Sequence, residues 1–96
     1  MSELNLRFYL DPQSGYPYIY NHRVTEEEVE EVLFRPGEDR NGCEGSRVAL
    51  GTTSRGRYLR VIYVPDPVPG SIFIVTAYDL EGKPLAAYRR RLRRKR

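Results

Sequence analysis

The sequence predicts a small α+β protein, a two-layer sandwich in which an antiparallel sheet of about four strands packs against helices. Three observations support this prediction. Residues 46–64 have the pattern of two strands joined by a short turn, residues 71–78 have the pattern of a third strand, and residues 25–34 have the pattern of a helix. A chain of 96 residues is expected to form one domain with one core.

The N-terminal part predicts an edge strand at residues 5–10, where apolar and polar side chains alternate. The segment from Asp11 to Gly15 ends this strand with residues typical of turns. Residues 16–22, with the sequence YPYIYNH, leave two alternatives open. They form either a short strand or a helical turn, because Pro17 opposes a helix interior but is tolerated in a first helical turn.

Residues 25–34 predict an N-terminal helix that lies on the surface. Thr25 is a good N-cap, and Glu28 completes a capping box three residues later. Apolar residues at helical spacing form a narrow stripe, and they are Val24, Val29, Val32 and Leu33. Pro36 and Gly37 are expected to stop the helix, and the following residues 36–46 are expected to form a polar loop.

The next segment predicts a hairpin, with strands at residues 47–53 and 57–64 and a turn at residues 54–56. Side chains alternate between the two faces of a strand. We therefore expect Leu59, Val61 and Tyr63 to face the helices, and Tyr58 and Arg60 to face the opposite side.

The C-terminal part begins with a strand at residues 71–78, which is rich in β-branched and aromatic residues and should lie centrally in the sheet. Leu85, Tyr88 and Leu92 follow at helical spacing and predict a basic C-terminal helix. The expected organisation is one domain at residues 1–88 and a basic tail at residues 89–96.

The charge of the chain is unevenly distributed. The basic tail, RRRLRRKR, contains seven of the sixteen Lys and Arg residues, so the remaining nine are outnumbered by thirteen Asp and Glu residues. A strongly basic tail on a mildly acidic body suits either the phosphates of a nucleic acid or an acidic protein partner.

The composition argues against several classes of protein. A single cysteine, Cys43, excludes an internal disulfide, and with a single histidine, His22, it leaves too few ligands for a structural zinc site. No motif predicts a metal or another cofactor. No segment has the roughly 20 apolar residues of a membrane helix, and the N-terminus lacks the pattern of a signal peptide. We therefore expect a cytoplasmic protein that does not associate with a membrane.

Short stretches within residues 6–90 carry a resemblance to a known family. They are Asp11-Pro12, Asn21 to Thr25 (NHRVT), Glu28 to Val32 (EVEEV), Gly51 to Thr53 (GTT), Gly56 to Tyr63 (GRYLRVIY) and Ile74 to Tyr78 (IVTAY). Together they resemble the BrnT branch of RelE-like toxins, and they are also similar to a related bacterial domain family of unknown function. The chain departs from the BrnT pattern at Arg23, where a Gly is frequent, and at Pro17, which interrupts a stretch that is helical in those relatives.

The resemblance implies a RelE-like fold and a bacterial toxin that cleaves RNA and is held inactive by an antitoxin protein. Metal-independent RNA cleavage needs a proton acceptor, a cation at the phosphate and a proton donor, for which His22, Arg60 and Tyr78 are the candidates. Further candidates for RNA contact are Arg47, Arg57, Tyr58, Arg89, Arg90, Arg91, Arg93 and Arg94.

Two alternatives remain open at this point. His22 and Tyr78 also suit packing roles, and the strand arginines also suit an ordinary solvated sheet surface. The function is therefore either that of an RNA-cleaving toxin or that of a non-catalytic RNA-binding or protein-interaction module on the same fold. The distribution of arginines on the folded surface should discriminate between these functions.

Overall fold

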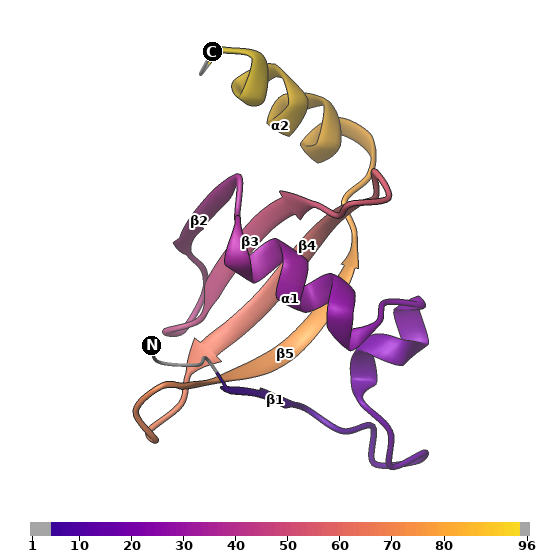
Figure 1. Ribbon diagram of the computed structural model, residues 1–96, viewed down its shortest axis with the longest axis vertical. Helices are drawn as coiled ribbons and strands as arrows, with labels where there is room; N and C mark the ends of the chain where they lie inside the picture. The colour runs from indigo at the N-terminus through magenta and orange to yellow at the C-terminus, as the bar shows by residue number, and fades with distance from the viewer. Residues whose placement is uncertain (1–4, 95–96) are drawn as a thin grey trace.

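The chain folds into one five-stranded sheet, as a computed structural model of residues 5–94 shows (Figure 1). Two separate clusters of buried side chains show that helices pack on both faces of this sheet. This confirms the predicted α+β sandwich. In that part of the chain the elements are β1 (Asn5–Phe8), the 3₁₀ helix η1 (Tyr18–His22), α1 (Glu26–Phe34), β2 (Glu38–Asn41), β3 (Arg47–Thr52), β4 (Tyr58–Pro65), β5 (Ser71–Asp79) and α2 (Gly82–Arg94).

The strands are arranged in the order β1-β5-β4-β3-β2. The last four in sequence form an antiparallel meander, which extends the predicted one, because β2 pairs with β3, β3 with β4 and β4 with β5. β1 occupies the edge as expected, but it runs parallel to β5. Leu10 lies beyond the end of β1 and is 51% exposed, so the inward alternation stops at Phe8.

β2 is a correction to the predicted polar loop at residues 36–46. Its sequence, EDRN, has little intrinsic preference for a strand. The edge of β3 supplies its backbone partners, and the register places Asp39 opposite Ala49. Two side chains from outside β2 hold it further, since the Tyr63 hydroxyl donates to Asp39 and Arg91 pairs with Glu38.

The main core lies between the sheet and the layer formed by η1 and α1. Leu59, Val61 and Tyr63 face this layer, as predicted. Val29 and Val32 of α1 are fully buried against them. α1 approaches β3 closely at Gly51, where an added Cβ would lie 3.0 Å from a methyl group of Val32. Figure 1 shows α1 crossing this face of the sheet.

The segment before α1, residues 16–22, had been predicted to form either a short strand or a helical turn, and the structure shows the helical turn. Residues 18–22 form the helical turn η1, and Pro17 stands just before it, where its ring removes no helical hydrogen bond. Arg23 then adopts a left-handed conformation with φ of 59°, which reverses the chain and buries Val24. The predicted capping box of Thr25 and Glu28 is present and starts α1.

α2 forms a second, smaller cluster on the opposite face of the sheet. Tyr88 is 1% exposed and packs with Val48, Leu50 and Leu80, and Tyr58, Ile62, Leu85 and Leu92 pack around this cluster. α2 confirms the predicted basic C-terminal helix and includes residues 89–94 of the basic tail, while Lys95 and Arg96 lie outside the described residues. Neither α1 nor α2 is long and apolar enough to cross a membrane, and this holds for every helix within residues 5–94.

Gly37 is expected to control the docking of α2. A Cβ at this position would overlap the hydroxyl of Tyr88, which is only 1% exposed. We expect Gly37→Ala to lower the free energy of unfolding by about 1–3 kcal/mol, because overpacking forces the ring and α2 to shift. Urea denaturation measures the effect. Arg35→Ala, at an exposed site nearby, is the control and should change stability by less than about 0.5 kcal/mol. Equal stability of the two variants would contradict this packing of Tyr88.

Candidate functional site

The fold brings two of the predicted catalytic residues into contact. β1 pairs only with the first half of β5, and η1 packs against β5 beyond the end of β1. His22, the last residue of η1, thereby lies edge-on to Tyr78, with ring centroids 5.7 Å apart. His22 is exposed and Tyr78 is half-buried. The pair comes from segments that are far apart in sequence, and it lies at the open edge of the sheet.

Arg60, the third predicted catalytic residue, is the cross-strand neighbour of Tyr78. The register of β4 and β5 pairs Arg60 with Tyr78, so both side chains leave on the same face of the sheet. This is the face opposite α1, as predicted for Arg60. Tyr78 therefore links His22 on one side to Arg60 on the other.

Arg60 has no carboxylate partner among residues 5–94. Its Nε is enclosed by the protein and makes no hydrogen bond within the described part of the chain, and the same holds for Oγ1 of Thr76 on the neighbouring strand. The pairing of Thr76 with Ile62 places this hydroxyl on the same face as Arg60. A half-buried guanidinium whose charge is not neutralised by the protein is suited to an anionic ligand.

A shallow hollow of about 430 Å³ lies beside the His22–Tyr78 pair. His22, Tyr78, Asp79 and Glu81 line it. Its walls thus combine two aromatic rings with two carboxylates. The Asp79 carboxylate is not free, because it accepts hydrogen bonds from Arg57, and these bonds hold its pKa below the ordinary value.

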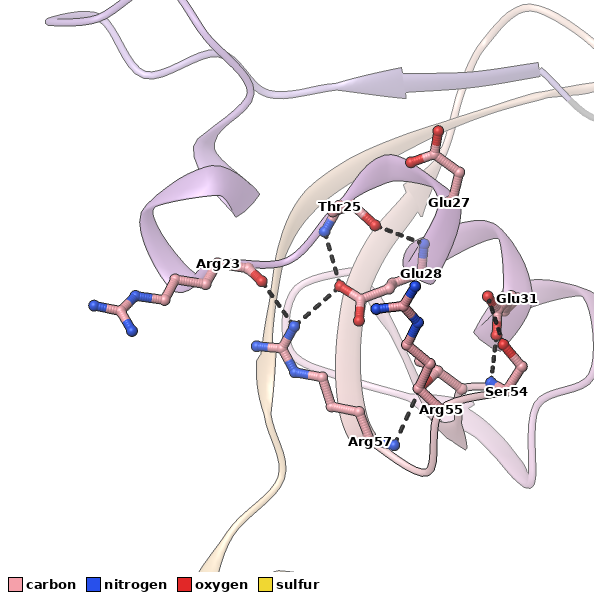
Figure 2. A pocket seen from close by; sticks show the side chains of 9 residues that line it. Arg23, Thr25, Glu27, Glu28, Glu31, Ser54, Arg55 and Arg57 are labelled. Carbon is pink, nitrogen blue, oxygen red and sulfur yellow. Dashed lines mark hydrogen bonds and ion pairs between the residues drawn. The ribbon is translucent and has the colours of Figure 1, made fainter.

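Arg57, a predicted RNA-contact residue, forms a network of hydrogen bonds that connects the elements around the site. It binds Asp79 through two hydrogen bonds, of 2.6 and 3.2 Å, and Glu28 through one of 3.0 Å. It also donates to the backbone carbonyls of Arg23 and His22, at 2.7 and 3.1 Å. Figure 2 shows its guanidinium between the Arg23 carbonyl and Glu28. Arg57 therefore positions the η1–α1 connection, including the backbone of His22.

Arg47 and Arg91 are also held by acidic side chains, although both were predicted to contact RNA. Arg47 binds Asp39 at 3.1 Å and Asn41 at 2.9 Å, and Asp39 accepts a further hydrogen bond from Tyr63. Arg91 binds Glu38 through two nitrogen atoms. Both arginines join β2 to the rest of the fold, and neither offers an unpaired cation to a ligand.

The remaining predicted RNA-contact residues gather on and beside α2. Arg89 lies over the ring of Tyr58, with Cζ 5.7 Å from the ring centroid, and Tyr58 in turn meets the buried Tyr88 edge-on. Arg89, Arg90, Arg93 and Arg94 are exposed. Tyr58, Arg89, Leu92 and Arg93 line a small hollow of about 220 Å³. These residues form a cationic and aromatic surface on the face that also carries Arg60.

Another hollow, of about 510 Å³, lies between the start of α1 and the turn at residues 54–56 (Figure 2). Its polar groups largely bind one another, since Thr25 and Glu28 form the capping box and Glu31 accepts from Ser54. The turn follows the predicted geometry, with Gly56 at φ of 87°. Arg57 is the one predicted site residue that lines this hollow, and the internal hydrogen bonds of the hollow indicate a structural role.

Within residues 5–94 no group of three or more His, Cys, Asp or Glu side chains is arranged to hold a metal ion. Cys43 is exposed and lies outside the sites described above. Comparisons of the chain with family models, with curated proteins and with solved structures found no match.

Proposed function

We propose that this chain is an RNA-cleaving protein that acts as the toxin of a cytoplasmic toxin–antitoxin pair, as its resemblance to BrnT and RelE-like toxins implies. The contact of His22 with Tyr78, together with the pairing of Tyr78 with Arg60, is the observation that supports the proposal. These residues supply a proton acceptor, a phenol and an unpaired cation on adjacent elements.

The proposed chemistry uses each of the three side chains once. His22 accepts the proton of the ribose 2′-hydroxyl, and the 2′-oxygen attacks the adjacent phosphorus. Arg60 stabilises the negative charge that rises on the phosphate oxygens in the transition state. The bond from phosphorus to the 5′-oxygen breaks, and the Tyr78 hydroxyl donates a proton to that leaving oxygen. The products are a 2′,3′-cyclic phosphate and a 5′-hydroxyl end.

A second function is favoured by the exposed surface of α2. Arg90, Arg93 and Arg94 are exposed, and Arg89 lies over Tyr58, whereas His22 has no hydrogen-bonded side chain to orient its ring among the described residues. Cations and an aromatic ring on one surface suffice for binding without cleavage. The alternative is a non-catalytic RNA-binding module on the same fold.

Cleavage of a labelled single-stranded RNA in the presence of EDTA tests the proposal. We expect 2′,3′-cyclic phosphate ends, and we expect His22→Gln and Arg60→Gln each to lower the cleavage rate on the order of a hundredfold. Arg55→Gln, which removes an exposed arginine from the turn at residues 54–56, is the matched control and should cleave at the wild-type rate.

The outcomes separate the two functions. RNA binding that weakens steeply with salt, without cleavage in the presence or absence of ribosomes, would establish the non-catalytic alternative. Cleavage that survives His22→Gln would remove His22 from the proposed chemistry. A circular dichroism spectrum and a urea midpoint for each variant show whether the fold is retained.

A further inference from the structure

Residues 9–22 and 78 carry two groups of aromatic rings, which we call the tyrosine ladder. Its first group runs from Tyr9 to Tyr18, His22 and Tyr78, with successive ring centroids 5.8, 5.8 and 5.7 Å apart. Its second group is the pair Tyr16 and Tyr20, whose rings stack with a centroid distance of 6.4 Å and an interplanar angle of 27°. The first group ends at the His22–Tyr78 pair and is therefore continuous with the candidate site, and the second group lies on the same short segment, residues 9–22.

The backbone holds these rings in place. The amide of Asp11 donates to the carbonyl of Tyr16, and the amide of Tyr18 donates to the carbonyl of Tyr9, both at 2.8 Å. The side chain of Asn21 donates to Asp11 at 2.9 Å and closes the segment on itself. The rings are therefore presented by an ordered segment, which lowers the conformational cost of binding a ligand.

Three tyrosines of the ladder have large exposed fractions. Tyr16 is 64% exposed, Tyr20 45% and Tyr9 41%, and the neighbouring Leu10 is 51% exposed. Tyr20 makes one weak hydrogen bond, to Glu26 at 3.5 Å, and the hydroxyls of Tyr9 and Tyr16 make none with residues 5–94. Several exposed apolar side chains on one segment are typical of a binding surface.

We infer that the tyrosine ladder is a base-stacking subsite for single-stranded RNA, which leads the strand to His22 and Tyr78. This inference rests on the proposed function, because it takes RNA as the ligand. Unpaired bases stack on exposed tyrosine rings irrespective of sequence, since every base has a π face. Double-stranded RNA keeps its bases stacked within the helix and cannot use such rings.

The charges around the ladder and on α2 indicate that the two surfaces contact different parts of the RNA. A carboxylate stands close to the second group of the ladder, because Glu26 accepts a hydrogen bond from Tyr20. The negative charge beside the Tyr16–Tyr20 pair disfavours phosphates there and suits bases. The exposed arginines of α2 provide the cations that hold phosphates. The ladder should therefore contribute affinity that is insensitive to salt, and α2 should contribute the salt-sensitive part.

Binding of a fluorescent 2′-O-methyl RNA oligonucleotide, which cannot be cleaved, tests the inference in the full chain. We expect the double variant Tyr16→Ala, Tyr20→Ala to raise Kd about tenfold or more, with an unchanged slope of log Kd against log salt. The double variant Tyr16→Phe, Tyr20→Phe keeps the rings and should bind like the wild type. Phe34→Ala removes an aromatic side chain that is 81% exposed outside the ladder, and it should leave Kd unchanged.

The inference is overturned if the double alanine variant binds as tightly as the wild type, if the phenylalanine variant loses as much affinity as the alanine variant, or if the wild type binds no single-stranded oligonucleotide. These results are distinct from failure of the proposed cleavage. Tyrosine-dependent binding without cleavage keeps the subsite and removes the enzyme activity. Cleavage and binding that ignore Tyr16 and Tyr20 keep the activity and remove the subsite.

Discussion

Replacement of Leu59 by alanine is expected to lower the free energy of unfolding by about 3–4 kcal/mol. Leu59 is 0% exposed and lies on the central strand β4, within the core beneath η1 and α1. Its partners across the sheet are Gly51, which has no side chain, and Asp79, which is held by Arg57. The cavity left by the missing isobutyl group cannot close without moving α1, so the full cost of an unfilled site is expected.

The control for this variant is Val64→Ala on the same strand. Val64 is half-buried and points to the opposite face, and it belongs to neither buried cluster. We expect a loss of about 1 kcal/mol or less for Val64→Ala. Urea denaturation monitored by circular dichroism gives both values. A larger loss for Val64→Ala than for Leu59→Ala would mean that the two faces of β4 are assigned the wrong way round.

Replacement of Arg57 by methionine is expected to lower the free energy of unfolding by about 3 kcal/mol at pH 7. The change retains most of the side-chain volume but removes hydrogen bonds to Asp79, to Glu28 and to the carbonyls of Arg23 and His22. The Arg57 side chain is only 25% exposed, so its partners lose contacts that water replaces incompletely. Arg55→Met, on the exposed turn beside it, should change stability by less than about 0.5 kcal/mol.

The effect of Arg57→Met should also depend on pH. Hydrogen bonds from Arg57 lower the pKa of Asp79 in the folded protein, so the folded state favours the ionised carboxylate. The stabilisation that this linkage provides is fully present above the unfolded pKa of about 3.9, and it is lost as the pH falls through the lower folded pKa. Unfolding measured between pH 7 and pH 2 should show the difference between wild type and Arg57→Met shrinking below about pH 4. A difference that stays constant over this range would contradict the Arg57–Asp79 linkage.

Local patterns in the sequence were sufficient to predict most of the elements. The capping box of Thr25 and Glu28 involves residues three positions apart, and it forms as predicted. The alternation along residues 57–64 predicted which side chains of β4 face the helices. Such features depend on neighbours in the chain, and their energies do not require knowledge of distant contacts.

Elements whose stability comes from distant partners could not be predicted in this way. Residues 38–41 become a strand because β3, Tyr63 and Arg91 hold them, and all of these partners follow later in the chain. The parallel pairing of β1 with β5 likewise joins segments more than sixty residues apart. The local sequences of residues 38–41 and of β1 do not indicate which distant segments they pair with.

In the candidate site, too, some features follow from the sequence and others only from the tertiary structure. The sequence by itself determined the residue types that suit RNA chemistry, namely one histidine, several tyrosines and a basic C-terminal helix. Only the tertiary structure decided which of them are available, because a charge is neutralised by whatever lies within a few ångströms in space. It pairs Arg47, Arg57 and Arg91 with carboxylates and places His22 against Tyr78, and among the described residues it gives Arg60 no carboxylate. Coulomb attraction and ring contacts act over short distances in space, and chain folding sets those distances independently of spacing in the sequence.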